Sequence, residues 1–264
     1  YLPENTGTYI SRLIIRLTAP SLILSTMISY DFDKKTILDG LRVSLLAIVF
    51  MLTGLLIGTI VSRLLKLDQR TAIVFRLHSF SGNIAYMGIP LLKALLGDRA
   101  VVLAAFFVIP FELLIWSLGV FLLSRGKSFS VSQTFKKLLN ANTISCLTGL
   151  IFAFTGLKPI VQGSFFGDKV FEAVYATLST LGGCTLPMIM IFIGLTVAER
   201  KDGGLISLLK KPLPLALSIT KLLVLPLVSF GTMQLFAGLI DPFVRTIVTL
   251  ETAMPCATIV VALA

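Results

Sequence analysis

Residues 76–90 have the sequence RLHSFSGNIAYMGIP and lie inside an apolar run that extends over 71–96. The segment contains Gly82, Gly88 and Pro90. In a helix interior, glycine costs about 1 kcal/mol and proline about 3 kcal/mol. Backbone groups that such residues free in lipid are costly unless they line a cavity inside the protein. We therefore favour a broken helix, whose half-helix ends point at a buried site, over an ordinary proline kink.

A second segment of this kind follows in the other half of the chain. Residues 251–258 have the sequence ETAMPCAT, with Pro255 at the expected break. Interrupted segments at corresponding places in two halves are the best sequence indication of a transporter's substrate site.

The composition places both segments in a membrane protein. The chain has 264 residues, of which 56% are hydrophobic and 14% charged, and its mean hydropathy is +0.95. An average soluble protein has about 25% charged residues. These values exclude disordered, nucleic-acid-binding and disulfide-scaffold classes. The three cysteines and the single histidine lie in apolar runs, and their pattern predicts no metal site.

Eight apolar stretches are long enough to cross a bilayer as helices. They run near 9–30, 41–65, 71–96, 100–124, 140–157, 169–198, 212–239 and 242–264. The loops that alternate along the chain differ in charge, with 11 basic residues in one set and 5 in the other. The first set is predicted to be cytoplasmic. It contains Arg63, Lys66, Arg70, Arg125, Lys127, Lys136, Lys137, Arg200, Lys201, Lys210 and Lys211.

The second half of the sequence repeats features of the first. Residues 18–24 (TAPSLIL) resemble 185–191 (TLPMIMI) at an offset of 167, and 88–90 (GIP) resemble 253–255 (AMP) at an offset of 165. The loop charges make the repeat inverted, which requires an odd number of spans in each unit. We expect five helices per repeat and ten in the natural protein, eight of them visible here. The units are 1–124 and 140–264, joined by a cytoplasmic linker at 125–139, with the first and last helices missing from this sequence.

Ionisable residues inside the spans are candidates for function because charge is expensive in a membrane. Lys221 and Glu251 lie deep in neighbouring spans. Their opposite signs fit either a structural ion pair or a proton-linked switch. Glu112 is similar, although Pro110 beside it suggests a local opening of the helix. Asn140 and Asn142 are expected to cap a helix that begins at 143.

Several classes of protein are excluded by missing motifs. The sequence has no Walker A pattern, no HExxH and no Ser/His/Asp set, so neither an ATP-driven pump nor an intramembrane hydrolase is supported. We expect no enzymatic activity. A potassium-type selectivity filter is also missing.

Four segments resemble the auxin efflux carrier family in its bacterial branch, within the bile acid/auxin transporter superfamily. They are 18–23 (TAPSLI), 82–90 (GNIAYMGIP), 118–120 (LGV) and 253–258 (AMPCAT). The resemblance covers the whole chain and implies ten helices in two inverted repeats, with two broken helices that cross at mid-membrane. It also implies a scaffold domain, a mobile transport domain and an elevator-like motion. The chain departs from the family at Ala141, where a proline is common, and at Ile259, where an asparagine is common.

These observations predict a secondary active transporter of small organic anions, such as malate-like or auxin-like carboxylates, in the plasma (inner) membrane of a bacterium. The alternatives are a receptor or scaffold that keeps the transporter fold, and an anion channel. We expect no cofactor, H⁺ or Na⁺ as the coupling ion, no nucleic-acid partner and, by family analogy, a homodimer. Lys221 and Glu251 are assigned to coupling or charge compensation. The predicted substrate-binding residues are Asn83, Gly88, Pro90, Met254, Pro255 and Thr258.

Overall fold

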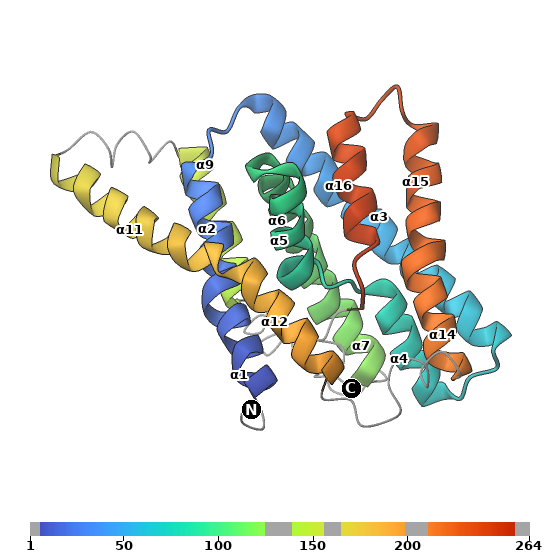
Figure 1. The fold of residues 1–264 in the computed structure, drawn as a ribbon. Helices are drawn as coiled ribbons and strands as arrows, with labels where there is room; N and C mark the ends of the chain where they lie inside the picture. The colour runs from blue at the N-terminus through green and yellow to red at the C-terminus, as the bar shows by residue number, and fades with distance from the viewer. Residues whose placement is uncertain (1–5, 125–138, 156–164, 199–210, 257–264) are drawn as a thin grey trace.

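A computed structural model describes residues 6–124, 139–155, 165–198 and 211–256. All regular elements in these ranges are helices (Figure 1), which confirms the predicted all-α membrane fold. In the first half they are α1 (Thr6–Leu13), η1 (Ile14–Thr18), α2 (Ala19–Ser29), α3 (Lys34–Leu64), α4 (Gln69–Phe80), η2 (Ile84–Gly88), α5 (Ile89–Leu96), α6 (Asp98–Leu114), η3 (Ile115–Gly119) and α7 (Val120–Ser124). In the second half they are α9 (Ala141–Thr155), α11 (Phe165–Gly183), α12 (Thr185–Ala198), α14 (Pro212–Ile219), η4 (Thr220–Val224), α15 (Leu225–Leu235) and α16 (Pro242–Thr252).

The four elements labelled η are single π-helical turns inside longer helices. Three of them end two residues before a proline, at Pro20, Pro90 and Pro226. Proline has no backbone N–H, so the helix loses a hydrogen bond at that point. A wider turn there absorbs the local change without ending the helix. At these three prolines the chain therefore stays helical.

Five of the eight predicted spans form helices long and apolar enough to cross a membrane. The stretch at 71–96 does not, because it is divided into α4 and a shorter apolar helix over Ile84–Leu96. The helix α9 is also shorter than a full span, and α16 has 11 residues within the described part of the chain. The division of 71–96 is the break that the glycines and the proline predict.

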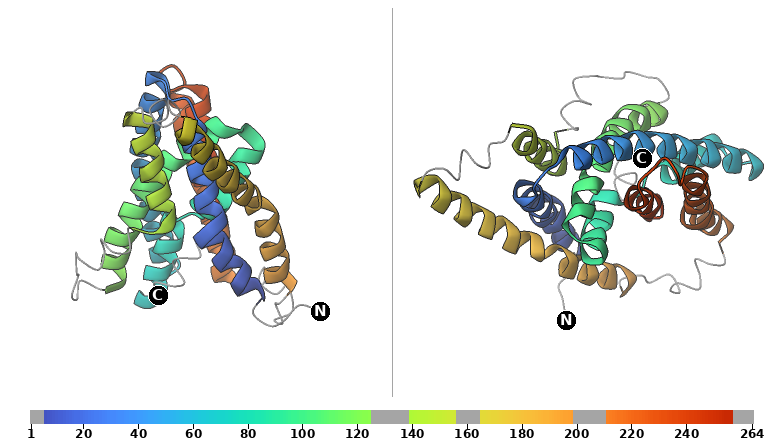
Figure 2. Two further views of the ribbon diagram at one scale, coloured as in Figure 1. Left: turned by 90° about the vertical axis from the view of Figure 1, so that its left-hand side faces the viewer. Right: turned by 90° about the horizontal axis from the view of Figure 1, so that it is seen from above.

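The helices pack mainly in two groups, which Figures 1 and 2 show side by side. The α2 group consists of α1, α2, α9, α11 and α12. The α3 group consists of α3 to α7 and α14 to α16. Each group takes helices from both halves of the sequence, so the packing groups do not coincide with the predicted repeats.

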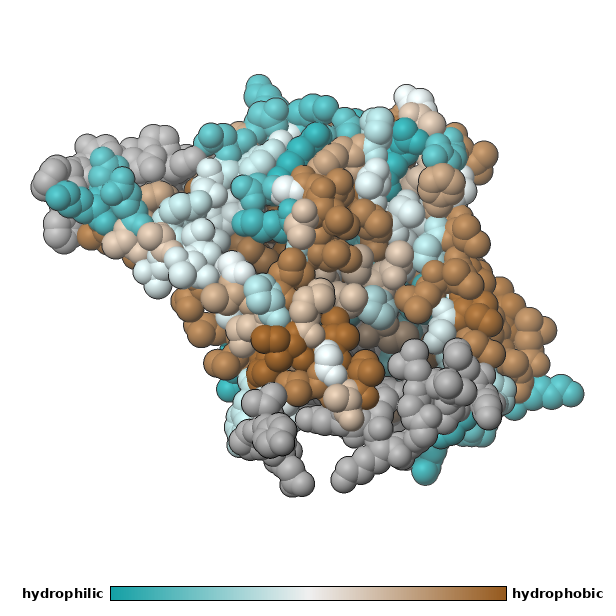
Figure 3. All heavy atoms as spheres, viewed as in Figure 1, coloured by the Kyte–Doolittle hydropathy of each residue, from teal (hydrophilic) through white to brown (hydrophobic). Residues whose placement is uncertain are grey.

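The main hydrophobic core lies around α6, where every residue from Ala100 to Val108 is buried. Large apolar side chains are exposed on α3, α11, α12 and α15. Figure 3 shows such residues across the middle of one face, with hydrophilic residues along its upper edge. This distribution fits helices whose outer surfaces contact lipid. The connection between α3 and α4 and the start of α14, both in the basic set of loops, lie at the same lower end in Figure 1.

Candidate functional site

The two interrupted segments lie directly against each other. After α4 ends at Phe80, the backbone continues in an extended form to Asn83. The N–H of Asn83 donates a hydrogen bond of 2.7 Å to the carbonyl oxygen of Pro255. Gly82 and Cys256 form an antiparallel bridge. Each segment thus satisfies backbone groups that the other leaves free, as a site away from water requires.

The two glycines of the first segment face buried ionisable side chains. A Cβ atom at Gly82 would lie 3.4 Å from Nζ of Lys221 and 3.5 Å from the carbonyl oxygen of Met254. A Cβ atom at Gly88 would lie 2.6 Å from Oε2 of Glu251. Position 88 therefore requires glycine, because any side chain there would clash with the carboxyl group of Glu251. This requirement is separate from the tendency of glycine to weaken the helix.

Lys221 and Glu251 line one small cavity inside the α3 group. Their exposed fractions are 2% and 1%. The cavity is closed by large apolar side chains, including Phe80 and Phe111. No N–O distance of 4.0 Å or less joins the two charged groups, and neither oxygen of Glu251 has a hydrogen-bond partner among the described residues. The structure therefore brings the two predicted residues into one cavity without forming a direct salt bridge.

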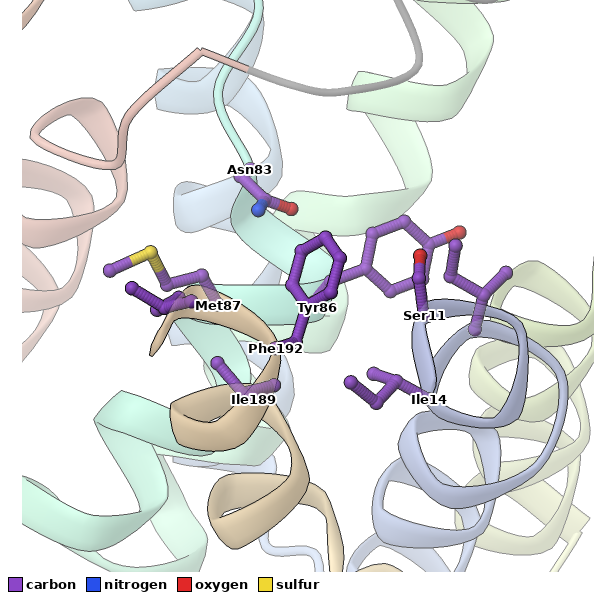
Figure 4. A pocket seen from close by; sticks show the side chains of 9 residues that line it. Ser11, Ile14, Asn83, Tyr86, Met87, Ile189 and Phe192 are labelled. Atoms are coloured by element: carbon purple, nitrogen blue, oxygen red, sulfur yellow. The ribbon is translucent and has the colours of Figure 1, made fainter. Parts of the chain in front are cut away.

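A larger pocket lies between the two groups of helices. The space inside it is about 50 Å³ in this conformation, below the roughly 300–1,000 Å³ that is typical of small-molecule sites. Figure 4 shows Asn83 at one end and Ile14 and Ile189 at the other. The α2 group contributes Ser11, Ile14, Ile15, Ile189, Phe192 and Ile193, and the α3 group contributes Asn83, Tyr86 and Met87.

The polar end of this pocket combines a side-chain amide with a helix start. Asn83 precedes η2, and its carbonyl oxygen accepts hydrogen bonds from the N–H groups of Met87 and Gly88. The residues from Ile84 to Tyr86 form the first turn of the helix that follows. The N–H groups of a first helical turn carry partial positive charge, which favours anions. The side-chain amide of Asn83 has no hydrogen-bond partner among the described residues. This end of the pocket can bind an anionic group without any charged side chain.

The predicted substrate-binding residues occupy different places around this arrangement. Asn83 lines the pocket, while Gly88 and Pro90 lie on the helix that follows it. Met254 and Pro255 lie on the second interrupted segment, which contacts the first. Lys221 and Glu251 lie in the smaller cavity, away from the pocket lining. Thr258 lies outside the described residues.

Most of the pocket lining was not predicted. Tyr86 lies inside the segment that predicted the break, but it was not singled out. The lining residues from α1 and α12 belong to ordinary apolar sequence, with Ser11 as the one hydroxyl among them. Nothing in their own sequence marks them, because their role depends on which helix packs against η2. Among the described residues, no group of three His, Cys, Asp or Glu side chains is placed to hold a metal ion.

Comparisons with known proteins agree with this architecture. The sequence model of a family described as membrane transport protein matches residues 1–264. A protein of Methanothermobacter thermautotrophicus, named only as an uncharacterized transporter, is 28% identical over 273 residues. The match covers 100% of this chain and 80% of that protein.

Proposed function

Because the chain belongs to the membrane transport protein family, which confirms the resemblance to auxin efflux carriers, we propose that it is a secondary active transporter of small organic anions. The observation that carries this proposal is a pocket between two helix groups with an anion-favouring helix start at its polar end. The cellular location that fits this activity is the plasma membrane. Substrate would bind at Asn83 and leave on the opposite side of the bilayer.

The packing of the helices supports alternating access. The pocket takes one wall from the α2 group and the other from the α3 group. A displacement of one group along the other would carry Asn83 and its helix start across the bilayer. This is the elevator-type motion that the family resemblance implies, and rigid-body movement of helix groups is a common way to achieve it.

The pocket lining supports an anion with an apolar body. None of its nine lining residues is charged, and only Ser11, Asn83 and Tyr86 are polar. A carboxylate at Asn83 would place the rest of the molecule toward Ile14 and Ile189. A second carboxylate would lie among these apolar groups without a partner, which is unfavourable. Among the predicted substrates, an auxin-like monocarboxylate therefore fits better than a malate-like dicarboxylate.

Lys221 and Glu251 are proposed to supply charge compensation near the crossing segments. Lys221 approaches Gly82, one residue before Asn83, so its positive charge adds to the attraction of the helix start for an anion. Glu251 in the same cavity offsets that charge when the pocket is empty. H⁺ and Na⁺ are the candidate coupling ions.

The test is uptake of labelled phenylacetate, an apolar monocarboxylate, into proteoliposomes. We expect saturable uptake that exceeds uptake of malate. Asn83→Ala removes one donor to a charged ligand, a change worth about 1.5–3 kcal/mol, or roughly 10- to 150-fold in affinity. The control is Gln234→Ala on α15, which removes an exposed amide oxygen that accepts a hydrogen bond from Arg245 on α16.

The results also separate the alternative functions. Ligand-induced thermal stabilisation without flux would indicate a receptor. Unsaturable currents would indicate a channel. Normal uptake by Asn83→Ala would contradict the assigned binding site.

A further inference from the structure

Another buried ionisable residue, Glu112, lies outside the cavity of Lys221 and Glu251. Glu112 is on α6 and is 3% exposed. It follows the start of that helix at Asp98 by 14 residues, which corresponds to about 21 Å along the helix axis. Its Oε2 accepts a hydrogen bond of 2.8 Å from Nε1 of Trp116. This carboxyl group therefore lies deep in the membrane-spanning part of the protein.

Polar groups of other helices converge on the same point. Asn140 caps α9 through hydrogen bonds from the N–H groups of Asn142 and Thr143, and its side chain also interacts with Glu112. The sequence predicts that Asn142 also caps this helix. That prediction is wrong, because α9 already begins at Ala141 and Asn142 lies inside it. Its side chain is 1% exposed, and neither Oδ1 nor Nδ2 has a hydrogen-bond partner among the described residues. The structure thus leaves the amide of Asn142 buried and unsatisfied, two residues after the Asn140 that neighbours Glu112.

Tyr86 connects this cluster to the pocket between the two helix groups. Its ring lines that pocket, and Tyr86 also lies near enough to Glu112 and Asn142 to feel them electrostatically. Glu112 and Tyr86 belong to the α3 group, whereas Asn142 belongs to the α2 group. The cluster therefore lies at the boundary that a movement between the groups would change.

Glu112 differs from Glu251 in its electrostatic surroundings. Glu251 shares a cavity with Lys221. The titratable and polar groups near Glu112 are Trp116 from η3, Tyr86 from η2, Asn140 at the start of α9 and Cys146 from α9. Asn142 of α9 lies near Tyr86. None of the described Lys, Arg or His residues on the elements packed against α6 approaches it. An ionised carboxylate without a cation in the membrane interior is expensive, so a proton is the natural means of neutralising it.

We propose that Glu112 is the proton-binding site of this transporter, and that Tyr86 and Asn142 link its protonation to occupation of the pocket. This inference rests on the proposed function. One proton from the aqueous phase binds the carboxylate to give a carboxylic acid, and the orphaned oxygen of Asn142 supplies an acceptor in the cluster. The proton returns to water on the other side when the α2 and α3 groups move apart at this boundary. No other bond is made or broken.

The direction of the coupling follows from charge. Protonation of Glu112 removes a negative charge that would repel an anion in the pocket, from which Glu112 is separated by Tyr86. For two negative charges roughly 10 Å apart and an effective dielectric constant of about 20, removing the repulsion raises the anion affinity on the order of tenfold. Linkage requires that bound anion favours proton uptake by the same factor. The anion and the proton should therefore cross the membrane together.

Infrared difference spectra of the full chain in nanodiscs test the proton site without any substrate. Between about pH 5 and pH 8, where a desolvated carboxyl group can titrate, wild-type protein and Glu251→Gln should show the C=O stretching band of a titrating carboxylic acid. Glu112→Gln should lack it. Should Glu112→Gln fold poorly, Trp116→Phe serves as the second variant. It removes the N–H donor to the carboxylate and should move the titration of the band to higher pH. A band that survives in Glu112→Gln, or that disappears in Glu251→Gln instead, overturns the proposal, as does a band that Trp116→Phe leaves unmoved.

Binding of labelled phenylacetate at constant Na⁺ concentration tests the linkage. Wild-type affinity should fall about tenfold from low to high pH, and Glu112→Gln should bind tightly at every pH. The same pH dependence in both proteins, or a dependence on Na⁺ alone, contradicts the coupling role. If no variant binds or transports any monocarboxylate, the proposed function fails, while the infrared result still decides whether Glu112 binds the proton.

Discussion

Adjacent glycines on α11 provide a direct test of how closely the helices of the α2 group approach. A Cβ atom at Gly182 would lie 2.7 Å from Cα and 2.9 Å from the backbone nitrogen of Leu22 on α2. At Gly183 a Cβ atom would meet nothing within 4 Å. Substitution by alanine favours the helix by about 1 kcal/mol at either position. The two variants therefore differ only in the contact with α2.

The expected difference follows from this contact. Backbone atoms of a packed helix cannot move aside as a flexible side chain can, so overpacking at Gly182 should cost about 1–3 kcal/mol. Both variants gain the same helix propensity, so this gain cancels when their melting temperatures are compared. For a protein of this size, 1 kcal/mol changes the melting temperature by about 2–4 °C. Gly182→Ala should thus melt roughly 2–12 °C below Gly183→Ala in the same detergent and at the same scan rate. Equal melting temperatures would falsify the close α2–α11 contact.

Three further predictions concern charged groups of the α3 group. Asp39→Asn should lower the melting temperature by several degrees, because its fully buried carboxylate pairs with two arginines that are themselves partly exposed, a loss of about 1–3 kcal/mol. Lys221→Leu should lower the free energy of unfolding more strongly, because it leaves Glu251 without a cation. The double variant Lys221→Leu/Glu251→Gln should recover most of that loss, whereas additive losses of the two single variants would contradict a shared electrostatic role. The hydrogen bond from Lys35 lowers the pKa of Asp241 from its usual 3.8, so this stabilisation should be present above that value and disappear as pH falls below it. Asp241→Asn should flatten that part of a pH–melting curve.

The broken helix could be predicted because its causes are local. Gly82, Gly88 and Pro90 lie within nine residues of one another, and each disfavours a continuous helix regardless of its neighbours. The common cavity of Lys221 and Glu251 could be anticipated in a similar way. Each is a lone charge deep in an apolar span, and opposite charges in neighbouring spans lower each other's cost.

The transport pocket could not be predicted in the same way because its walls are joined only by tertiary packing. Ile14 and Ile189 are separated by 175 positions, yet they share one small hydrophobic cluster with Tyr86 packed against it. Neither isoleucine differs in type from the lipid-facing residues around it. Asn142 shows the same limit, since its neighbouring Asn140 is the actual cap and only the approach of α6 reveals a buried, unsatisfied amide.

The distribution of buried charge between the helix groups indicates which residue can respond to transport. The cavity of Lys221 and Glu251 is lined entirely by elements of the α3 group. If this group moves as a unit, the surroundings of those two side chains stay constant through the cycle, and their protonation states have no reason to change. Glu112, unlike Lys221 and Glu251, has neighbours at the start of α9 and on it, in the other group. A movement between the groups must change its surroundings, because it separates Glu112 from the start of α9. A group whose surroundings alternate can bind a proton on one side and release it on the other. This is the reason for proposing Glu112 as the coupling residue and a constant electrostatic role for Lys221 and Glu251.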